Sequence, residues 1–255
     1  MNNSHGYFID VPDSTNFVKQ RNIWHQSMAN DKKLRLDAVN LTLSADAYKY
    51  GYQWEWCGVP IIRHPDDIVL QQEIMFTLKP VKVIETGIAR GGSLVLSSTL
   101  QKISDMKSQV LGIDIKIFDH ALSALKPWIN KGEVEIIECD STSDIAFQHA
   151  KTFLAGTDTP CLLILDSDHS QSHVLKELSL FCELLPKSSI IMVADTIIEE
   201  MPDGYYKNRT WGKGNNPFSA IQLFLKQNQN WELNKNYSRR SLMGEFRDGI
   251  LTKIA

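Results

Sequence analysis

The stretch VKVIETGIARGGS, residues 81–93, decides the fold. Its first part, 81–85, is a short β-branched run of strand length, and Gly87 ends it. Its second part leads into a helical pattern that begins at Ser93 and reaches about Ile103. A strand that turns through glycines into a helix is the opening unit of a parallel sheet, because parallel strands need a long crossover between them.

The same alternation continues along the chain. Further strands are predicted at 110–114, 134–139, 161–166, 189–195, 231–234 and 249–253. Helices are predicted at 119–125, 144–154, 173–185 and 217–228, and we expect Pro127 to break the first of them. This pattern favours an α/β fold with a doubly wound, mostly parallel sheet covered on both faces. Ligands of such sheets bind beyond the carboxyl ends of the strands, so the candidate site residues are sought there.

The composition is that of an ordinary globular chain. The 255 residues include 27 basic and 30 acidic side chains, a formal net charge of −3. No Lys/Arg-rich block is present, which argues against a nucleic-acid partner. No apolar run approaches the roughly 20 residues of a membrane span, and residues 1–5 lack the pattern of a secretory signal. We therefore expect a cytoplasmic protein with no transmembrane segment and with its four cysteines reduced.

Two regions of the chain differ in character. Residues 1–50 are polar and irregular, with one charged helix predicted at 31–40. We expect them to form an N-terminal arm or small helical cap. Residues 51–255 carry the strand–helix alternation and are predicted to form the main domain.

The glycine loop after the first strand predicts a cofactor site. It contains Gly87, Arg90, Gly91, Gly92 and Ser93, and the acidic Glu85 precedes it. Its spacing is neither that of a dinucleotide fingerprint nor that of a P-loop, because no lysine follows the last glycine. An acidic residue before the first glycine favours a cationic ligand such as S-adenosylmethionine, which carries an amino group and a sulfonium. The alternative is a plain strand-to-helix turn.

The next two strand ends also carry acidic residues. Asp114 lies at the distance from the glycine loop at which an acidic side chain binds ribose hydroxyls. Asp140 and Ser141 follow the third strand, where the aspartate is suited to the exocyclic amino group of adenine. The alternative, which we weigh equally, is a helix N-cap for the segment from Asp144, for which Ser141 and Ser143 are suited.

The fourth and fifth strand ends carry the sharpest chemical signal. Asp166, Asp168 and His169 follow one strand, and Asp195 ends the next. Carboxylates gathered at one place repel unless a cation joins them, and oxygen ligands favour Mg²⁺ or another hard divalent ion. His169 is then available as a general base. The alternative is a pair of solvated strand-end aspartates with a hydrogen-bonded histidine.

Aromatic residues elsewhere suggest an acceptor site. Trp54 belongs to a Trp-rich stretch that is suited to form a flat apolar wall, although core packing would explain it equally well. The segment MPDGYYKNRTWGKGNN, residues 201–216, has the composition of a long loop directly after the fifth strand. Loops of this length are often lids, and the alternative is a mobile surface loop. The candidate acceptor contacts in this loop are Tyr205, Tyr206, Arg209 and Trp211.

Taken together, these motifs resemble the cephalosporin hydroxylase / rhamnosyl O-methyltransferase family over about residues 50–255. The matching positions are Trp54, Gly58, Pro60, 65–67, 84–87, 90–93, 112–114, 165–170, His173, Val174, Glu177, Leu178 and 193–196. The resemblance implies a class I S-adenosylmethionine-dependent methyltransferase fold with seven strands, often with bound Mg²⁺. It also implies that Glu85 and the glycine loop surround the methionine part of the cofactor, that Asp114 holds the ribose and that Asp166 binds the metal beside the base His169.

One position departs from the family pattern. Related sugar O-methyltransferases have Glu-Asp at the end of the fifth strand, with both carboxylates near the metal. This sequence has Ala194-Asp195, so one carboxylate is missing. Asp168, Thr196 or a water would have to fill the gap, or the metal is bound more weakly.

The sequence thus predicts a metal-assisted O-methyltransferase of carbohydrate or polysaccharide biosynthesis. Its acceptor would be a hydroxyl of a neutral sugar, a glycan or a related small molecule. Hydroxylation is disfavoured because no facial-triad spacing of metal ligands is present. Two alternatives stay open: an NAD(P)-dependent oxidoreductase on the same type of sheet, and a non-catalytic S-adenosylmethionine-binding subunit. The sequence leaves open whether the chain forms a homo-oligomer.

Overall fold

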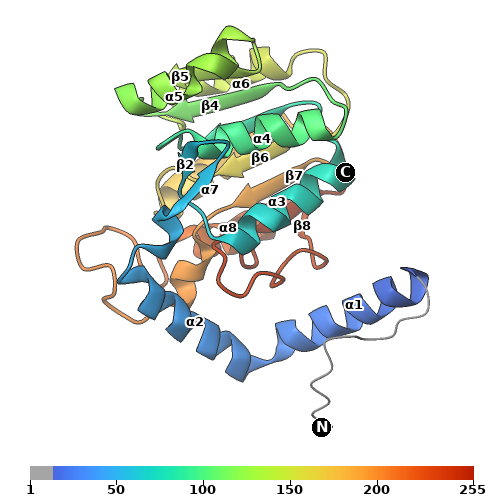
Figure 1. The fold of residues 1–255 in the computed structure, drawn as a ribbon, viewed down its shortest axis with the longest axis vertical. Coiled ribbons are helices and arrows are strands. Elements are labelled where there is room, and N and C mark those ends of the chain that lie inside the picture. The colour runs from blue at the N-terminus through green and yellow to red at the C-terminus, as the bar shows by residue number, and fades with distance from the viewer. Residues whose placement is uncertain (1–13) are drawn as a thin grey trace.

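A twisted seven-stranded sheet forms the centre of the computed structural model, which describes residues 14–255 (Figure 1). The strand order is β5-β4-β3-β6-β7-β9-β8. The first five of these strands pair in parallel, whereas β9 runs antiparallel between β7 and β8. The strands are β3 (Val83–Thr86), β4 (Val110–Asp114), β5 (Val134–Glu138), β6 (Leu162–Leu165), β7 (Ile190–Val193), β8 (Trp231–Leu233) and β9 (Ile250–Lys253). The predicted seven-stranded, mostly parallel α/β fold is therefore confirmed.

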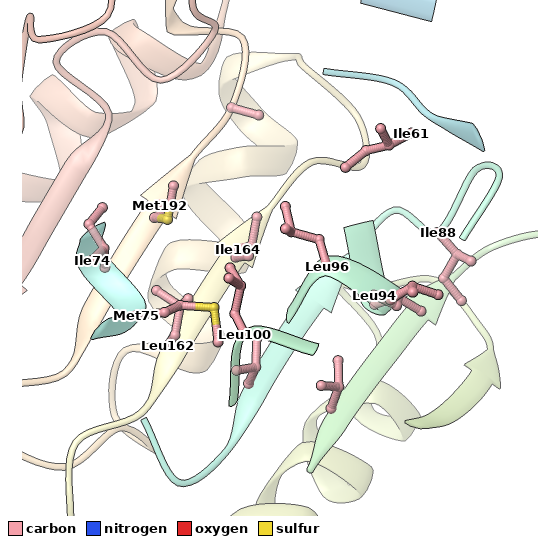
Figure 2. Close-up of a cluster of buried hydrophobic side chains, with 14 of the residues drawn as sticks. Ile61, Ile74, Met75, Ile88, Leu94, Leu96, Leu100, Leu162, Ile164 and Met192 are labelled. Carbon is pink, nitrogen blue, oxygen red and sulfur yellow. The ribbon is translucent and has the colours of Figure 1, made fainter. Parts of the chain in front are cut away.

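Three helices cover each face of the sheet. One face packs against α3 (Pro65–Leu78), α4 (Gly92–Ile103) and α5 (Asp119–Asn130), and the other against α6 (Asp144–Leu154), α7 (Gln171–Phe181) and α8 (Pro217–Gln227). Strands β6 and β7 are apolar at every position because alternate residues point to opposite faces and both faces are covered. In β6, Leu162 and Ile164 belong to the first cluster, shown in Figure 2, whereas Leu163 and Leu165 belong to the second.

The prediction that Pro127 breaks its helix is wrong. Helix α5 runs through Pro127 to Asn130. A proline inside a helix removes one backbone hydrogen bond, but Trp128 and Ile129 pack against the core of that face. Their burial therefore favours continuation of the helix, an influence of packing that local sequence does not reveal.

The region before residue 50 is more regular than its composition suggests. Two helices, α1 (Ser14–Asn30) and α2 (Lys32–Asp46), meet at Asp31, whose side chain accepts a hydrogen bond from the Leu34 amide and caps α2. Helix α1 extends away from the sheet, whereas α2 lies beside the segment after β7 (Figure 1). The part of the predicted arm before residue 14, including residues 1–5, lies outside the described residues.

Short elements link α2 to the sheet. A 3-10 turn, η1 (Tyr50–Tyr52), precedes a hairpin of β1 (Trp54–Trp56) and β2 (Val59–Ile61), and a second 3-10 turn, η2 (Thr196–Glu200), follows β7. Sequence reasoning predicted neither the hairpin nor helix α3. Within residues 14–255, none of the helices combines the length and the apolar character that crossing a membrane requires.

Candidate active site

A cavity of about 700 Å³ opens at the carboxyl ends of β3, β6 and β7. The glycine loop forms one wall, and the segment 201–216 and helix α2 form another. Residues Asp166, His169 and Asp195 line the cavity together. Its position is the one at which open α/β sheets bind ligands.

The strand register brings the two aspartates together. Leu165 of β6 pairs with Val193 of β7, and the Ala194 amide donates to the Leu165 carbonyl at 2.9 Å. Asp166 and Asp195 therefore leave adjacent parallel strands at the same level. Asp195 has a φ of 57°, a left-handed conformation that bends the chain into η2.

Asp166, His169 and Asp195 form a compact polar cluster. One ligand atom from each lies within 4.8 Å of the others. His169 Nε2 is 3.2 Å from Asp195 Oδ2, and the two side chains are 21% and 23% exposed, so both are reachable from the cavity. Burial raises the pKa of Asp166 to about 7, against the opposing positive charge of Arg63. Two carboxylates and an imidazole at this spacing form a donor set for a divalent cation.

Arg63 lies beneath this cluster and, with Glu85, forms what we call the charged floor of the site. Sequence reasoning assigned no role to Arg63. Its side chain is fully buried, and Nη2 lies 3.2 Å from Glu85 Oε1 and 3.6 Å from Asp166 Oδ2. Nη1 donates to Gln71 Oε1 at 2.9 Å, and the guanidinium lies over the Phe246 ring at 4.9 Å. Glu85, predicted to contact the cofactor, is thus a fully buried partner of Arg63 and does not line the cavity.

The glycine-loop residues predicted to bind the cofactor all line the cavity: Gly87, Arg90, Gly91, Gly92 and Ser93. Its glycines also have a packing role. A Cβ on Gly87, whose φ is 88°, would lie 1.9 Å from the carbonyl oxygen of Asp166, and one on Gly92 would lie 2.4 Å from that of Pro60. These positions need glycine for close approach of two backbones, whatever ligand the loop binds.

Four predicted site residues outside this loop bind neighbouring parts of the chain. Asp114 Oδ2 accepts hydrogen bonds from the Ile88 and Ala89 amides at 2.7 and 3.4 Å, so it holds the glycine loop in place. Asp140 Oδ1 accepts from the Thr142 amide, and Ser141 Oγ lies 3.0 Å from His173 Nε2. Asp168 Oδ1 accepts from the Ser170 amide at 2.8 Å and stands outside the three-residue cluster. Of the two candidate caps, Ser141 and Ser143, Ser143 caps α6, where its side chain accepts a hydrogen bond from the Ala146 amide.

The aromatic residues of segment 201–216 meet the cluster directly. The Trp211 ring lies edge-on to His169 with centroids 5.1 Å apart, and it packs on Tyr206 at 4.6 Å. Arg209 lies 5.5 Å from the centre of the Trp211 ring. Tyr205 donates to Asp46 of α2 at 2.6 Å, so the segment is tied to that helix. All four side chains line the cavity.

Trp54 lies elsewhere. Its ring packs edge-on against Tyr50 at 5.4 Å, and it belongs to the residues that flank the core cluster of Figure 2. Tyr50, which sequence reasoning did not single out, lines the cavity whereas Trp54 does not.

Glu245 is a cavity residue that sequence reasoning missed. It belongs to the loop that leads into β9, and its carbonyl accepts a hydrogen bond from the Thr196 amide at 3.0 Å. Because β9 is antiparallel, its first residues lie at the edge where the parallel strands end. The acidic residues just before the predicted last strand were the sequence signal that could have indicated Glu245 as a site residue. Burial raises the pKa of Glu245 well above its ordinary value, and the negative charge of Asp195 adds to this effect.

The sheet order, with one antiparallel strand inserted at sixth position, and the cavity at its strand ends define a class I methyltransferase-like fold. The chain belongs to the Rhamnosyl O-methyltransferase/CmcI family, whose model matches residues 48–254.

Individual relatives agree with this assignment. The chain is 27% identical over 172 residues to the Rhamnosyl O-methyltransferase of Mycobacterium leprae (strain TN), covering 68% of this chain and 70% of that one. It is 28% identical over 170 residues to the protein of the same name from Mycobacterium tuberculosis (strain ATCC 25618 / H37Rv), covering 66% and 65%. The chain thus spans about two thirds of the length of these relatives. A solved structure of CmcI with Mg and SAM has a TM-score of 0.57 at 20% identity, over 80% of this chain and 78% of that one, a likeness of fold.

Proposed function

We propose that this protein is an S-adenosylmethionine-dependent O-methyltransferase that acts on a hydroxyl group of a sugar or glycan. The observation that carries the proposal is the cluster of Asp166, His169 and Asp195, which opens into a cavity beside the glycine loop. The family and the names of its relatives support the reaction class and a carbohydrate acceptor.

The cavity and its glycine wall fit the methyl donor. A volume of about 700 Å³ lies within the usual range for small-molecule sites, and the lining offers backbone groups at the start of α4. S-adenosylmethionine supplies the electrophilic methyl group on its sulfonium. In this proposal Gly87, Arg90 and the 91–93 segment contact the donor, Asp140 and Ser141 lie near its adenine, and Asp114 keeps the loop in position and binds ribose with its remaining acceptor capacity.

The cluster fits a divalent ion by its chemistry. Asp166 and Asp195 offer oxygens that are close enough to meet at one point, and His169 lies beside them with its imidazole left for proton transfer. The half-buried Asp166 has its pKa raised to about 7, because the positive charge of Arg63 compensates its desolvation only in part. A cation bound beside it would favour the ionised form of this carboxyl group. Mg²⁺ bound here would supply a positive charge that makes a nearby hydroxyl more acidic.

His169 is the proposed general base. Its Nε2 atom is oriented by Asp195, and within residues 14–255 no hydrogen bond is formed to its Nδ1 atom. The edge of the Trp211 ring fixes the imidazole from another side. His169 would take the proton from the acceptor hydroxyl while its oxygen bonds to the methyl carbon and the carbon–sulfur bond breaks, releasing S-adenosylhomocysteine.

The aromatic segment 201–216 is the proposed acceptor wall. Trp211 and Tyr206 present ring surfaces of the kind that packs against sugar rings, and Arg209 and Tyr205 add polar groups. Helix α2 contributes Asp46 to the same wall, so part of the predicted N-terminal cap takes part in acceptor binding in this proposal.

A methyl-transfer assay with a panel of rhamnosides and other neutral sugars tests the proposal. We expect transfer by the wild type, a loss of about 10²–10⁴-fold in kcat for His169→Ala, and unchanged binding of S-adenosylhomocysteine by that variant. Full activity of His169→Ala would show that His169 is not the general base. Full activity in the presence of EDTA would show that the reaction needs no divalent metal. A wild type that binds S-adenosylhomocysteine but transfers no methyl group would favour a non-catalytic subunit, a reading that Ala194 supports.

A further inference from the structure

The missing carboxylate at position 194 raises the question of what replaces it. Ala194 is buried and packs in the same core cluster as Phe246, so no polar side chain reaches the cavity from this position. Asp168, one candidate for the gap, is engaged by Ser170 and lies outside the cluster. Thr196, a second candidate, donates its hydroxyl hydrogen bond to carbonyls of the 245–247 segment.

The chain places another carboxylate beside the cluster from a different element. Glu245 lines the same cavity as Asp166, His169 and Asp195. Its backbone is fixed from two sides, by the Thr196 amide that bonds its carbonyl at 3.0 Å and by Asp67 Oδ2, which accepts from its amide at 2.7 Å. Glu245 is therefore tied directly to the residue that follows Asp195.

The side chain of Glu245 has no protein partner that explains its position. Within residues 14–255 its carboxylate accepts no hydrogen bond and forms no ion pair. The negative charges of Asp195, Asp67 and Asp166 act on it, and the positive charge of Arg63 opposes them only in part. Arg63, the buried cation nearby, is bonded to Glu85 and Gln71 instead. A carboxylate that faces a cavity among other carboxylates is costly unless a cation is bound there.

We propose that Glu245 is the third carboxylate of the metal site and replaces the one that the family pattern places at position 194. The inference rests on the metal-assisted function proposed above. Glu245 lies outside the set of atoms that are within 4.8 Å of one another. Mg²⁺ keeps several of its waters when protein-bound, so in this proposal Glu245 binds the ion through one of those waters. The C-terminal loop before β9 thereby becomes part of the active site.

Mn²⁺ titration followed by electron paramagnetic resonance, in the presence of S-adenosylhomocysteine, tests this inference without a turnover assay. Glu245→Gln keeps the shape of the side chain and removes its charge. We expect its Kd for Mn²⁺ to rise by about tenfold or more, with the Kd for S-adenosylhomocysteine unchanged within about twofold. Glu232→Gln, an exposed carboxylate on β8, is the matched control and should leave both constants unchanged.

Thermal melting without metal separates a metal role from a structural one. Glu245→Gln should melt no lower than the wild type, because it loses repulsion and no hydrogen bond. A clearly lower melting temperature would show that Glu245 holds the fold, and would overturn the inference.

The remaining outcomes are distinct. An unchanged Kd for Mn²⁺ in Glu245→Gln, with binding abolished in Asp166→Asn, would overturn the role of Glu245 and leave the metal site standing. A wild type that binds S-adenosylhomocysteine but no Mn²⁺ would overturn both the role of Glu245 and metal assistance. A wild type that binds neither would overturn the proposed function itself.

Discussion

Removal of Arg63 should destabilise the protein strongly. Arg63 and Glu85 are both fully buried, with Nη2 and Oε1 3.2 Å apart. At an effective dielectric constant of about 20, this pair alone corresponds to roughly 5 kcal/mol of Coulomb energy, part of which offsets the desolvation of both ions. Breaking such a pair from one side costs about 3–5 kcal/mol, because a charge is left buried without its partner.

Urea unfolding of Arg63→Met at neutral pH measures this loss. The expected loss corresponds to a decrease in Tm of roughly 6–20 °C for a chain of this size. Glu85→Gln in the same chain removes the stranded charge and should restore about 2 kcal/mol. Arg21→Met, at an exposed position of α1, is the control and should change stability by less than about 0.5 kcal/mol.

Two results would refute the reasoning about Arg63. The first is an Arg63→Met variant within about 1 kcal/mol of the wild type, below the range for a broken buried pair. The second is a double variant no more stable than Arg63→Met alone. Either would mean that Glu85 is not charged in the native state or that water reaches it.

Three further predictions concern backbone, protonation and acceptor binding. Gly87→Ala and Gly132→Ala both place a side chain at positive φ, but only the first meets another backbone. In urea unfolding, Gly132→Ala should lower the free energy of unfolding by about 1–3 kcal/mol, and Gly87→Ala should lower it by about 1–3 kcal/mol more. Equal losses in the two variants would contradict the close approach of the backbones at Gly87. Burial raises the pKa of Asp67 to about 7. Between about pH 4 and 7, Asp67 is therefore protonated in the native state but ionised in the unfolded state, so the free energy of unfolding should fall as the pH rises through that window. Asp67→Asn should flatten this slope in urea unfolding at several pH values, and an unchanged slope would place the titration elsewhere. Trp211→Ala should raise the acceptor KM by about tenfold with S-adenosylhomocysteine binding unchanged, whereas an unaltered KM would exclude the ring from the acceptor site.

The sheet could be predicted from the sequence because its signals are local. Apolar runs of strand length alternate with helices, and Val110–Asp114 and Asp144–Leu154 coincide with the predicted elements. The convergence of Asp166 and Asp195 also follows from topology, since both end neighbouring parallel strands. Helix α3 and the hairpin of β1 and β2 were missed because their burial depends on packing against α4 and the sheet, which no local pattern reveals.

The charged floor of the site could not be predicted, because it joins distant parts of the chain. Arg63 precedes α3, Glu85 lies in β3 and Glu245 precedes β9, and no local motif links the three positions, although Glu85 alone was noted as the acidic residue before the glycine loop. Asp114 shows the complementary limit. Its spacing from the glycine loop indicated a ribose contact, whereas the structure shows hydrogen bonds to the loop itself.

A crystal structure with S-adenosylhomocysteine and Mn²⁺ tests the central claim most directly. The account predicts an anomalous peak coordinated by Asp166 and Asp195, the cofactor along the glycine loop from Gly87 to Ser93, and its sulfur facing the space between His169 and Trp211. A cofactor bound outside this cavity, or bound in it with no metal peak at saturating Mn²⁺ and the two aspartates still turned toward Arg63 and His169, would contradict it.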